Sequence, residues 1–101
     1  MSTQYPIENW DLIVKHFNTL FGGLGEIIQD DKSIRFCSIR PDVETSISID
    51  RNGDFGASMP LHGAEGKIDN VLFSNSKVIL SGQNLNYTYR IPPEILSKRM
   101  E

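Results

Sequence analysis

The sequence predicts an α+β domain, in which an amphipathic N-terminal helix packs on one face of an antiparallel β-meander of about six to seven short strands. Apolar residues recur at helical spacing near the N-terminus, and apolar and polar residues alternate after residue 24. Clusters of turn-forming residues separate the alternating segments. We expect a single domain over 1–101, because this length is typical of one domain and no change of composition divides the chain.

The helix is expected to begin near Trp10 and to end before Gly22-Gly23. Pro6 precedes it, acidic residues in its first turn suit the helix dipole, and the two glycines allow the left-handed backbone that commonly ends a helix. His16 falls outside the apolar stripe and is expected to face solvent. The stripe, at positions i, i+3, i+4, i+7, i+10 and i+11, consists of Trp10, Ile13, Val14, Phe17, Leu20 and Phe21.

The rest of the chain is predicted to form antiparallel strands, because no gap between them can hold a crossover helix. Residues 94–99 can add a short helical turn after Pro92-Pro93. Turn clusters occupy residues 30–33, 40–42, 51–53, 62–66, 74–76 and 81–84. The expected strands are 24–29, 34–39, 44–50, 54–60, 67–73, 77–80 and 85–91.

The hairpin around Asn52-Gly53 indicates which sheet face is buried. A two-residue turn would place the apolar rows of the two strands on opposite faces, whereas a three-residue loop over 51–53 places both rows on one face. We therefore predict the three-residue loop, with Gly53 left-handed in a G1 bulge. The expected pairs are Ile49–Phe55, Ile47–Ala57 and Thr45–Met59. The other face carries Ser46, Ser48, Asp50, Gly56 and Ser58, and we expect it to be hydrated or to contact a partner.

Composition and charge argue against several function classes. The net charge of −3 disfavours nucleic acid and anionic membranes as partners. Residues 1–75 hold 11 acidic and 6 basic residues, whereas 76–101 hold 2 acidic and 4 basic ones, so the acidic surplus lies on the helix and first hairpins. No stretch approaches the roughly 18 apolar residues of a membrane span. The start of the chain lacks signal-peptide features and Cys37 has no pairing partner, which predicts a cytoplasmic protein.

No catalytic, metal or cofactor site is predicted. The histidines show no metal-binding spacing, and the segment with His62, Glu65 and Asp69 is more typical of a polar turn. Cys37 lies in an apolar strand and is expected to be a buried, inert thiol, with no base tied to it by sequence.

Three further patterns have structural explanations. The glycines at 22, 23 and 25 follow a helix rather than precede one, so no helix N-terminus points at them as in a phosphate loop. Asp30 and Asp31 stand in a plain turn rather than as an acid/base pair. Tyr87 and Tyr89 alternate with polar residues on the core side of the last strand, which disfavours a base-stacking surface for RNA.

In overall character the chain resembles the stand-alone immunity proteins of bacterial polymorphic-toxin and contact-dependent growth inhibition systems. The shared features are a single acidic domain, serine- and asparagine-rich strands and the lack of a catalytic motif. The resemblance implies a stoichiometric inhibitor that binds a cognate toxin domain, often a nuclease, and blocks its active site. Its implied contacts are the acidic residues on turns and strand ends, Asp30, Asp31, Asp42, Glu44, Asp50 and Asp54. By sequence, Glu65 and Asp69 are equally eligible.

Two other function classes remain open. The chain could self-associate as a structural or regulatory domain, through the polar sheet face or through an unpaired edge strand such as 24–29 or 85–91. It could also bind a small molecule, or act as an enzyme, in a cleft between helix and sheet. A molecular mass that rises with concentration would favour self-association, and a deep pocket lined by His16 or Cys37 would favour an enzyme.

Overall fold

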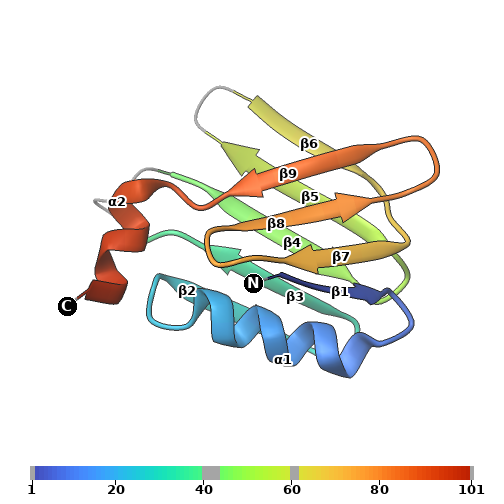
Figure 1. The fold of residues 1–101 in the computed structure, drawn as a ribbon, viewed down its shortest axis with the longest axis horizontal. Helices are drawn as coiled ribbons and strands as arrows, with labels where there is room; N and C mark the ends of the chain where they lie inside the picture. Colours follow the sequence, from blue (N-terminus) through green and yellow to red (C-terminus); the bar gives the residue numbers. More distant parts are fainter. Residues whose placement is uncertain (1, 40–43, 60–61, 101) are drawn as a thin grey trace.

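The computed structural model describes residues 2–39, 44–59 and 62–100 and confirms the α+β class with its N-terminal helix (Figure 1). In this part of the chain nine strands form two antiparallel sheets, not one meander of six to seven. Sheet A has the order β1-β7-β8-β9, and sheet B has the order β2-β3-β4-β5-β6. The elements are β1 (Thr3–Pro6), α1 (Trp10–Phe21), β2 (Glu26–Gln29), β3 (Ser33–Cys37), β4 (Ser46–Asp50), β5 (Asp54–Met59), β6 (His62–Lys67), β7 (Asn70–Phe73), β8 (Lys77–Ser81), β9 (Asn86–Arg90), α2 (Pro93–Leu96) and the 3₁₀ helix η1 (Ser97–Met100).

The two sheets and the helix share one hydrophobic core. Phe21 of α1 packs on Phe36 of sheet B, with ring centroids 4.5 Å apart, and on Tyr89 of sheet A at 6.1 Å. Phe55 of sheet B also packs on Tyr87 of sheet A, with ring centroids 5.7 Å apart. Figure 1 shows α1 along the lower side of the molecule, beneath β1. The helix therefore contacts both sheets, and the prediction that it covers one face of a single sheet is wrong.

The chain passes from sheet B to sheet A at residues 68 and 69, inside the segment 67–73 that was expected to be one strand. The Ile68 N–H donates at 2.8 Å to the carbonyl of Gly53, in the β4–β5 loop of sheet B. The Asp69 N–H donates at 2.7 Å to the carbonyl of Ser81, in β8 of sheet A. Because the apolar face of each sheet has to be covered, a corner here lets one sheet cover the other.

Two strands were not expected from the sequence. Residues 62–66 were predicted to be a turn, but they lie in β6, which pairs with β5 along its whole length. Glycine disfavours strands, and the pairing in the folded chain overrides that preference at Gly63 and Gly66. The segment β1, before the helix, pairs with β7.

The hairpin between β4 and β5 has the predicted three-residue loop. The register pairs Ile49 with Phe55 and Ile47 with Ala57. Gly53 has φ 101° and its N–H donates to the Asp50 carbonyl at 2.9 Å, so the left-handed position falls on glycine as expected. The face opposite this apolar row is the outer face of sheet B.

The helix has the predicted length, and five of the six residues of the predicted stripe are buried, while Val14 is half-buried. Gly23 after the helix has φ 81°. The expected solvent exposure of His16 is wrong. Its ring stacks on Phe73 with centroids 4.5 Å apart, and its Nδ1 lies 3.1 Å from the Tyr5 hydroxyl. The reason is that sheet A packs beside the helix, where β7 brings Phe73 and the unexpected strand β1 brings Tyr5 against His16.

Cys37 is also placed differently from the expectation of a buried thiol. Ile34 and Phe36 of β3 point into the core, so the alternation of the strand turns Cys37 to the outer face, where it is half-buried. On that face it lies between Glu26 and Ser46 of the neighbouring strands.

The C-terminal turn expected at 94–99 is present as α2 followed by η1. Tyr89 is fully buried and Tyr87 is half-buried, which confirms that these tyrosines belong to the core. The turn expected at 40–42 lies outside the described residues. In the part of the chain that the structure describes, no helix combines the length and the apolar character that membrane crossing requires.

Candidate functional site

Two hairpin turns lie side by side at one end of sheet B. The antiparallel register pairs Ser33 with Asp50, so the β2–β3 turn and the β4–β5 loop are neighbours. The Arg51 N–H donates to the Lys32 carbonyl at 2.7 Å, and Arg51 Nη1 lies 3.4 Å from the Asp31 carbonyl oxygen. These bonds hold the two turns together.

This arrangement gathers four of the six acidic residues that the resemblance implies as partner contacts. Asp30 and Asp31 lie on the β2–β3 turn, and Asp50 and Asp54 flank the β4–β5 loop. Glu44 precedes β4 at its opposite end, about 20 Å from Asp50 at the rise of an extended strand. Asp42 lies outside the described residues.

The carboxylate of Asp30 accepts hydrogen bonds from residues of its own turn. Its Oδ1 accepts the Lys32 N–H at 2.8 Å, the Ser33 N–H at 2.9 Å and the Ser33 hydroxyl at 3.3 Å. The two backbone N–H groups are the main reason why the pKa of Asp30 lies below its usual value. Asp30 thus shapes the turn that presents Asp31.

Further carboxylates extend this surface, which we call the acidic end. Glu65 lies opposite Gly56 on the outer face of sheet B, and Asp69 follows the corner residue that is bonded to Gly53. Glu8 and Asp11 line a pocket at the start of α1 together with Arg51. Among the described residues the acidic end holds Glu8, Asp11, Asp30, Asp31, Asp50, Asp54, Glu65 and Asp69, with Lys32, Arg35, Arg51 and Lys67 as its bases.

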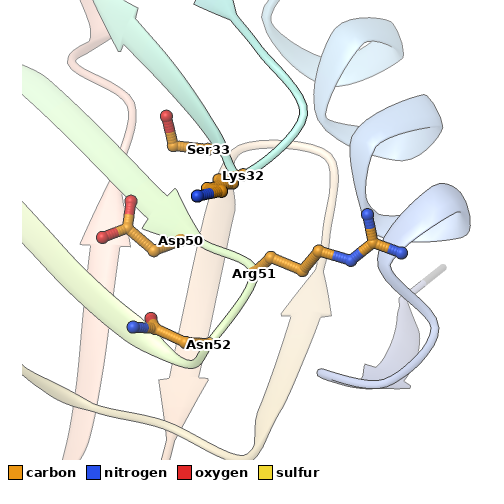
Figure 2. A pocket seen from close by; sticks show the side chains of 5 residues that line it. All are labelled: Lys32, Ser33, Asp50, Arg51 and Asn52. Carbon is orange, nitrogen blue, oxygen red and sulfur yellow. The ribbon is translucent and has the colours of Figure 1, made fainter.

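A shallow pocket of about 470 Å³ opens between the two turns. Lys32, Ser33, Asp50, Arg51 and Asn52 line it (Figure 2). In Figure 2 the side chains of Lys32, Asp50 and Asn52 point to one side of the loop, whereas Arg51 extends to the other side, toward α1. Arg51 also borders the pocket of about 250 Å³ at the start of α1, so the loop presents its carboxylate and its guanidinium in different directions.

A groove of larger volume, about 730 Å³, lies on the outer face of sheet B. Asp50, Asp54 and Glu65 provide its carboxylates, and Lys67 is its basic residue. We call it the β4–β6 groove; it is lined by Ser48, Asp50, Asp54, Phe55, Gly56, Glu65, Gly66 and Lys67. It lies on the polar sheet face that the hairpin register predicts.

Sequence reasoning did not separate Glu65 from the other acidic residues. Recognising residues 62–67 as a strand would have placed Glu65 on the outer sheet face, but the glycines in this segment made it resemble a turn. Once these residues are paired with β5, Glu65 comes opposite Gly56 and shares a groove with Asp50 and Asp54.

The residues considered for catalysis lie elsewhere. His16 and Cys37 line none of the three pockets described above. Within residues 2–39, 44–59 and 62–100, no group of three or more His, Cys, Asp or Glu side chains could hold a metal ion. The chemistry that the acidic end offers is the binding of a positively charged surface.

Comparison of the chain with protein-family models, with curated proteins and with solved structures finds no match.

Proposed function

We propose that this protein is an immunity-type inhibitor that binds a basic surface of a cognate toxin domain through its acidic end and blocks the toxin's active site. The observation that carries the proposal is the convergence of Asp31, Asp50 and Asp54 with Glu65 from separate turns and strands. A second copy of the chain or another protein class would be the alternative partner.

The physical reason lies in charge complementarity. An enzyme that cleaves nucleic acid needs a basic groove for the phosphate backbone, and an acidic protein surface can occupy that groove. Opposite charges also steer the two proteins together, so association is fast and depends on salt. An inhibitor of this kind needs no catalytic group of its own.

The test compares one charge reversal inside the acidic end with one outside it. The partner is the toxin domain that the proposal predicts to be encoded beside the gene for this chain, and stopped-flow fluorescence measures the association rate. We expect Asp50→Lys to slow association about tenfold at 20 mM NaCl and less than about twofold at 500 mM, because salt screens exposed charges.

Glu44→Lys is the matched control, since Glu44 is an exposed carboxylate at the other end of β4. It should slow association clearly less than Asp50→Lys does at 20 mM and should leave the rate unchanged at 500 mM. The distance of about 20 Å from the acidic end is about one Debye length at 20 mM and several Debye lengths at 500 mM. Equal slowing by both substitutions, or no complex at micromolar concentration, would contradict the proposal.

Self-association is the second candidate, and the edge strands favour it. Residues 24–29 and 85–91 were predicted as possible edges, and β2 and β9 within them do lie at sheet edges. Ile28 on β2 is 54% exposed, although it is a large apolar side chain. Light scattering separates the candidates: a mass that doubles with concentration in wild type and not in Ile28→Glu supports self-association through β2.

A further inference from the structure

We propose that the β4–β6 groove receives an arginine side chain of the partner protein. This inference rests on the proposed function, because it names the group by which a basic partner is recognised. The side chain expected to bind on the outer face of sheet B is long and positively charged, and its tip is flat.

The floor of the groove is open because Gly56 carries no side chain. In the outward-facing row Gly56 lies between Ser48 of β4 and Glu65 of β6. A Cβ placed on Gly56 would meet Ser48 Oγ at 3.4 Å and no other atom within 4 Å. The space above this residue therefore belongs to the groove, and a side chain of another protein can enter it.

The walls of the groove carry an excess of negative charge. Three carboxylates, those of Asp50, Asp54 and Glu65, face one lysine, Lys67. Lys67 Nζ lies 3.6 Å from Asp54 Oδ1, but the side chains are 69% and 52% exposed, so water weakens this ion pair. An incoming cation can replace Lys67 beside Asp54 at little cost, and Asp50 and Glu65 line the same groove.

Arginine fits this environment better than lysine. Its guanidinium is planar and donates two parallel hydrogen bonds to a carboxylate, and its aliphatic stem can lie along a flat surface such as a strand with glycines. Lysine presents a compact, strongly hydrated charge that gains less from the floor of the groove.

The experiment uses two short peptides as probes. Acetylated and amidated tetra-arginine and tetra-lysine are titrated into the ¹⁵N-labelled full chain, and the amide resonances of Glu65, Gly66 and Lys67 are followed by NMR. We expect the largest shifts at these residues, and a dissociation constant about threefold or more lower for tetra-arginine than for tetra-lysine.

Gly56→Val tests the groove itself, since its side chain would occupy the space above the floor. We expect it to weaken tetra-arginine binding at least about tenfold. The valine side chain would occupy the surface along which the aliphatic stem of arginine lies, and it would keep the guanidinium away from the carboxylates. Thr88→Val is the matched control on the exposed outer face of sheet A and should leave binding unchanged. Glu65→Gln removes charge without adding volume, so it tests the same site should Gly56→Val fold poorly.

The inference is overturned if Gly56→Val and Glu65→Gln bind tetra-arginine as wild type does, if the two peptides bind equally, or if the largest shifts fall at Glu8 and Asp11. If the toxin associates as proposed but Gly56→Val does not weaken the complex, the groove inference fails and the proposed function stands. If tetra-arginine fills the groove and no toxin binds, the proposed function fails and the arginine site remains.

Discussion

Thr45 and Tyr89 form a polar contact inside the core. Thr45 is buried, and its Oγ1 lies 2.8 Å from the Tyr89 hydroxyl and 3.0 Å from the Ser58 carbonyl oxygen. Because the threonine hydroxyl can donate to the carbonyl, the tyrosine hydroxyl can donate to the threonine. The pair is thus satisfied, and it ties the entry to β4 in sheet B to β9 in sheet A.

Tyr89 predicts a loss of stability at alkaline pH. Burial raises the pKa of Tyr89 from 10.0 to about 12. In the unfolded chain the phenol loses its proton near pH 10, whereas the folded protein keeps it bound until about pH 12. The stability that the buried, protonated Tyr89 provides is therefore fully present below pH 10. As pH rises from 10 toward 12, the free energy of unfolding should fall by about 2 to 3 kcal/mol. Urea unfolding at pH 8, 10 and 11.5 measures it.

Tyr89→Phe is the control for this prediction. It removes the hydroxyl, so it should cost about 1 kcal/mol at pH 8 through the lost hydrogen bond to Thr45. Between pH 10 and 12 it should lose less stability than wild type, because it has no proton to release at this position. An identical alkaline loss in both proteins would show that Tyr89 is not the responsible group.

The turn between β8 and β9 fits closely against the strand that leaves sheet B. A Cβ on Gly82 in this turn would overlap the Lys67 carbonyl oxygen and lie 3.3 Å from Ile68 Cα. These are backbone atoms at the corner where β6 passes into β7, so they cannot move aside alone. Gly82 thus lets the two sheets approach each other, whereas Gly56 leaves space for a partner.

The two glycines should respond in opposite ways to the same substitution. We expect Gly82→Ala to lower the free energy of unfolding by about 1 to 3 kcal/mol, because the turn has to move away from the corner. Gly56→Ala should be neutral or raise it by up to about 1 kcal/mol, since alanine restricts the unfolded chain more than glycine does. Urea unfolding of both variants measures the difference, and equal effects would contradict the close fit at Gly82.

Acidic side chains are concentrated at one end of the described part of the molecule. The acidic end has eight acidic and four basic side chains among the described residues. At the other end of sheet A, Lys77 and Arg90 lie directly opposite each other. The formal net charge of only −3 conceals this concentration. A surface with such an excess of one sign repels itself and attracts an oppositely charged partner.

Salt should therefore stabilise the isolated protein. Raising NaCl from 20 to 500 mM screens the repulsion within the acidic end, so we expect the free energy of unfolding to rise by about 0.5 to 1 kcal/mol. The double variant Asp31→Asn, Asp50→Asn should be more stable than wild type at 20 mM and should gain less from salt. Glu44→Gln should keep the wild-type gain. A gain that is the same in all three proteins would contradict this prediction.

The folded chain differs from the sequence prediction mainly where contacts between distant segments decide. The apolar stripe of α1 and the register of the β4–β5 hairpin depend on spacing within a short segment, and both were predicted correctly. The strand at 62–67 was mistaken for a turn because its glycines have no preference for strands, and only pairing with β5 gives it that structure.

Taken alone, the amino-acid order determined the class of the fold, the helix and the burial of one face of the central hairpin. Each follows from a periodicity that one element displays by itself. The tertiary structure alone decided that the strands divide into two sheets at Ile68, that sheet A packs on His16, and that Asp31, Asp50 and Glu65 lie at one end. These outcomes depend on which sheet faces cover each other, and no local pattern carries that information.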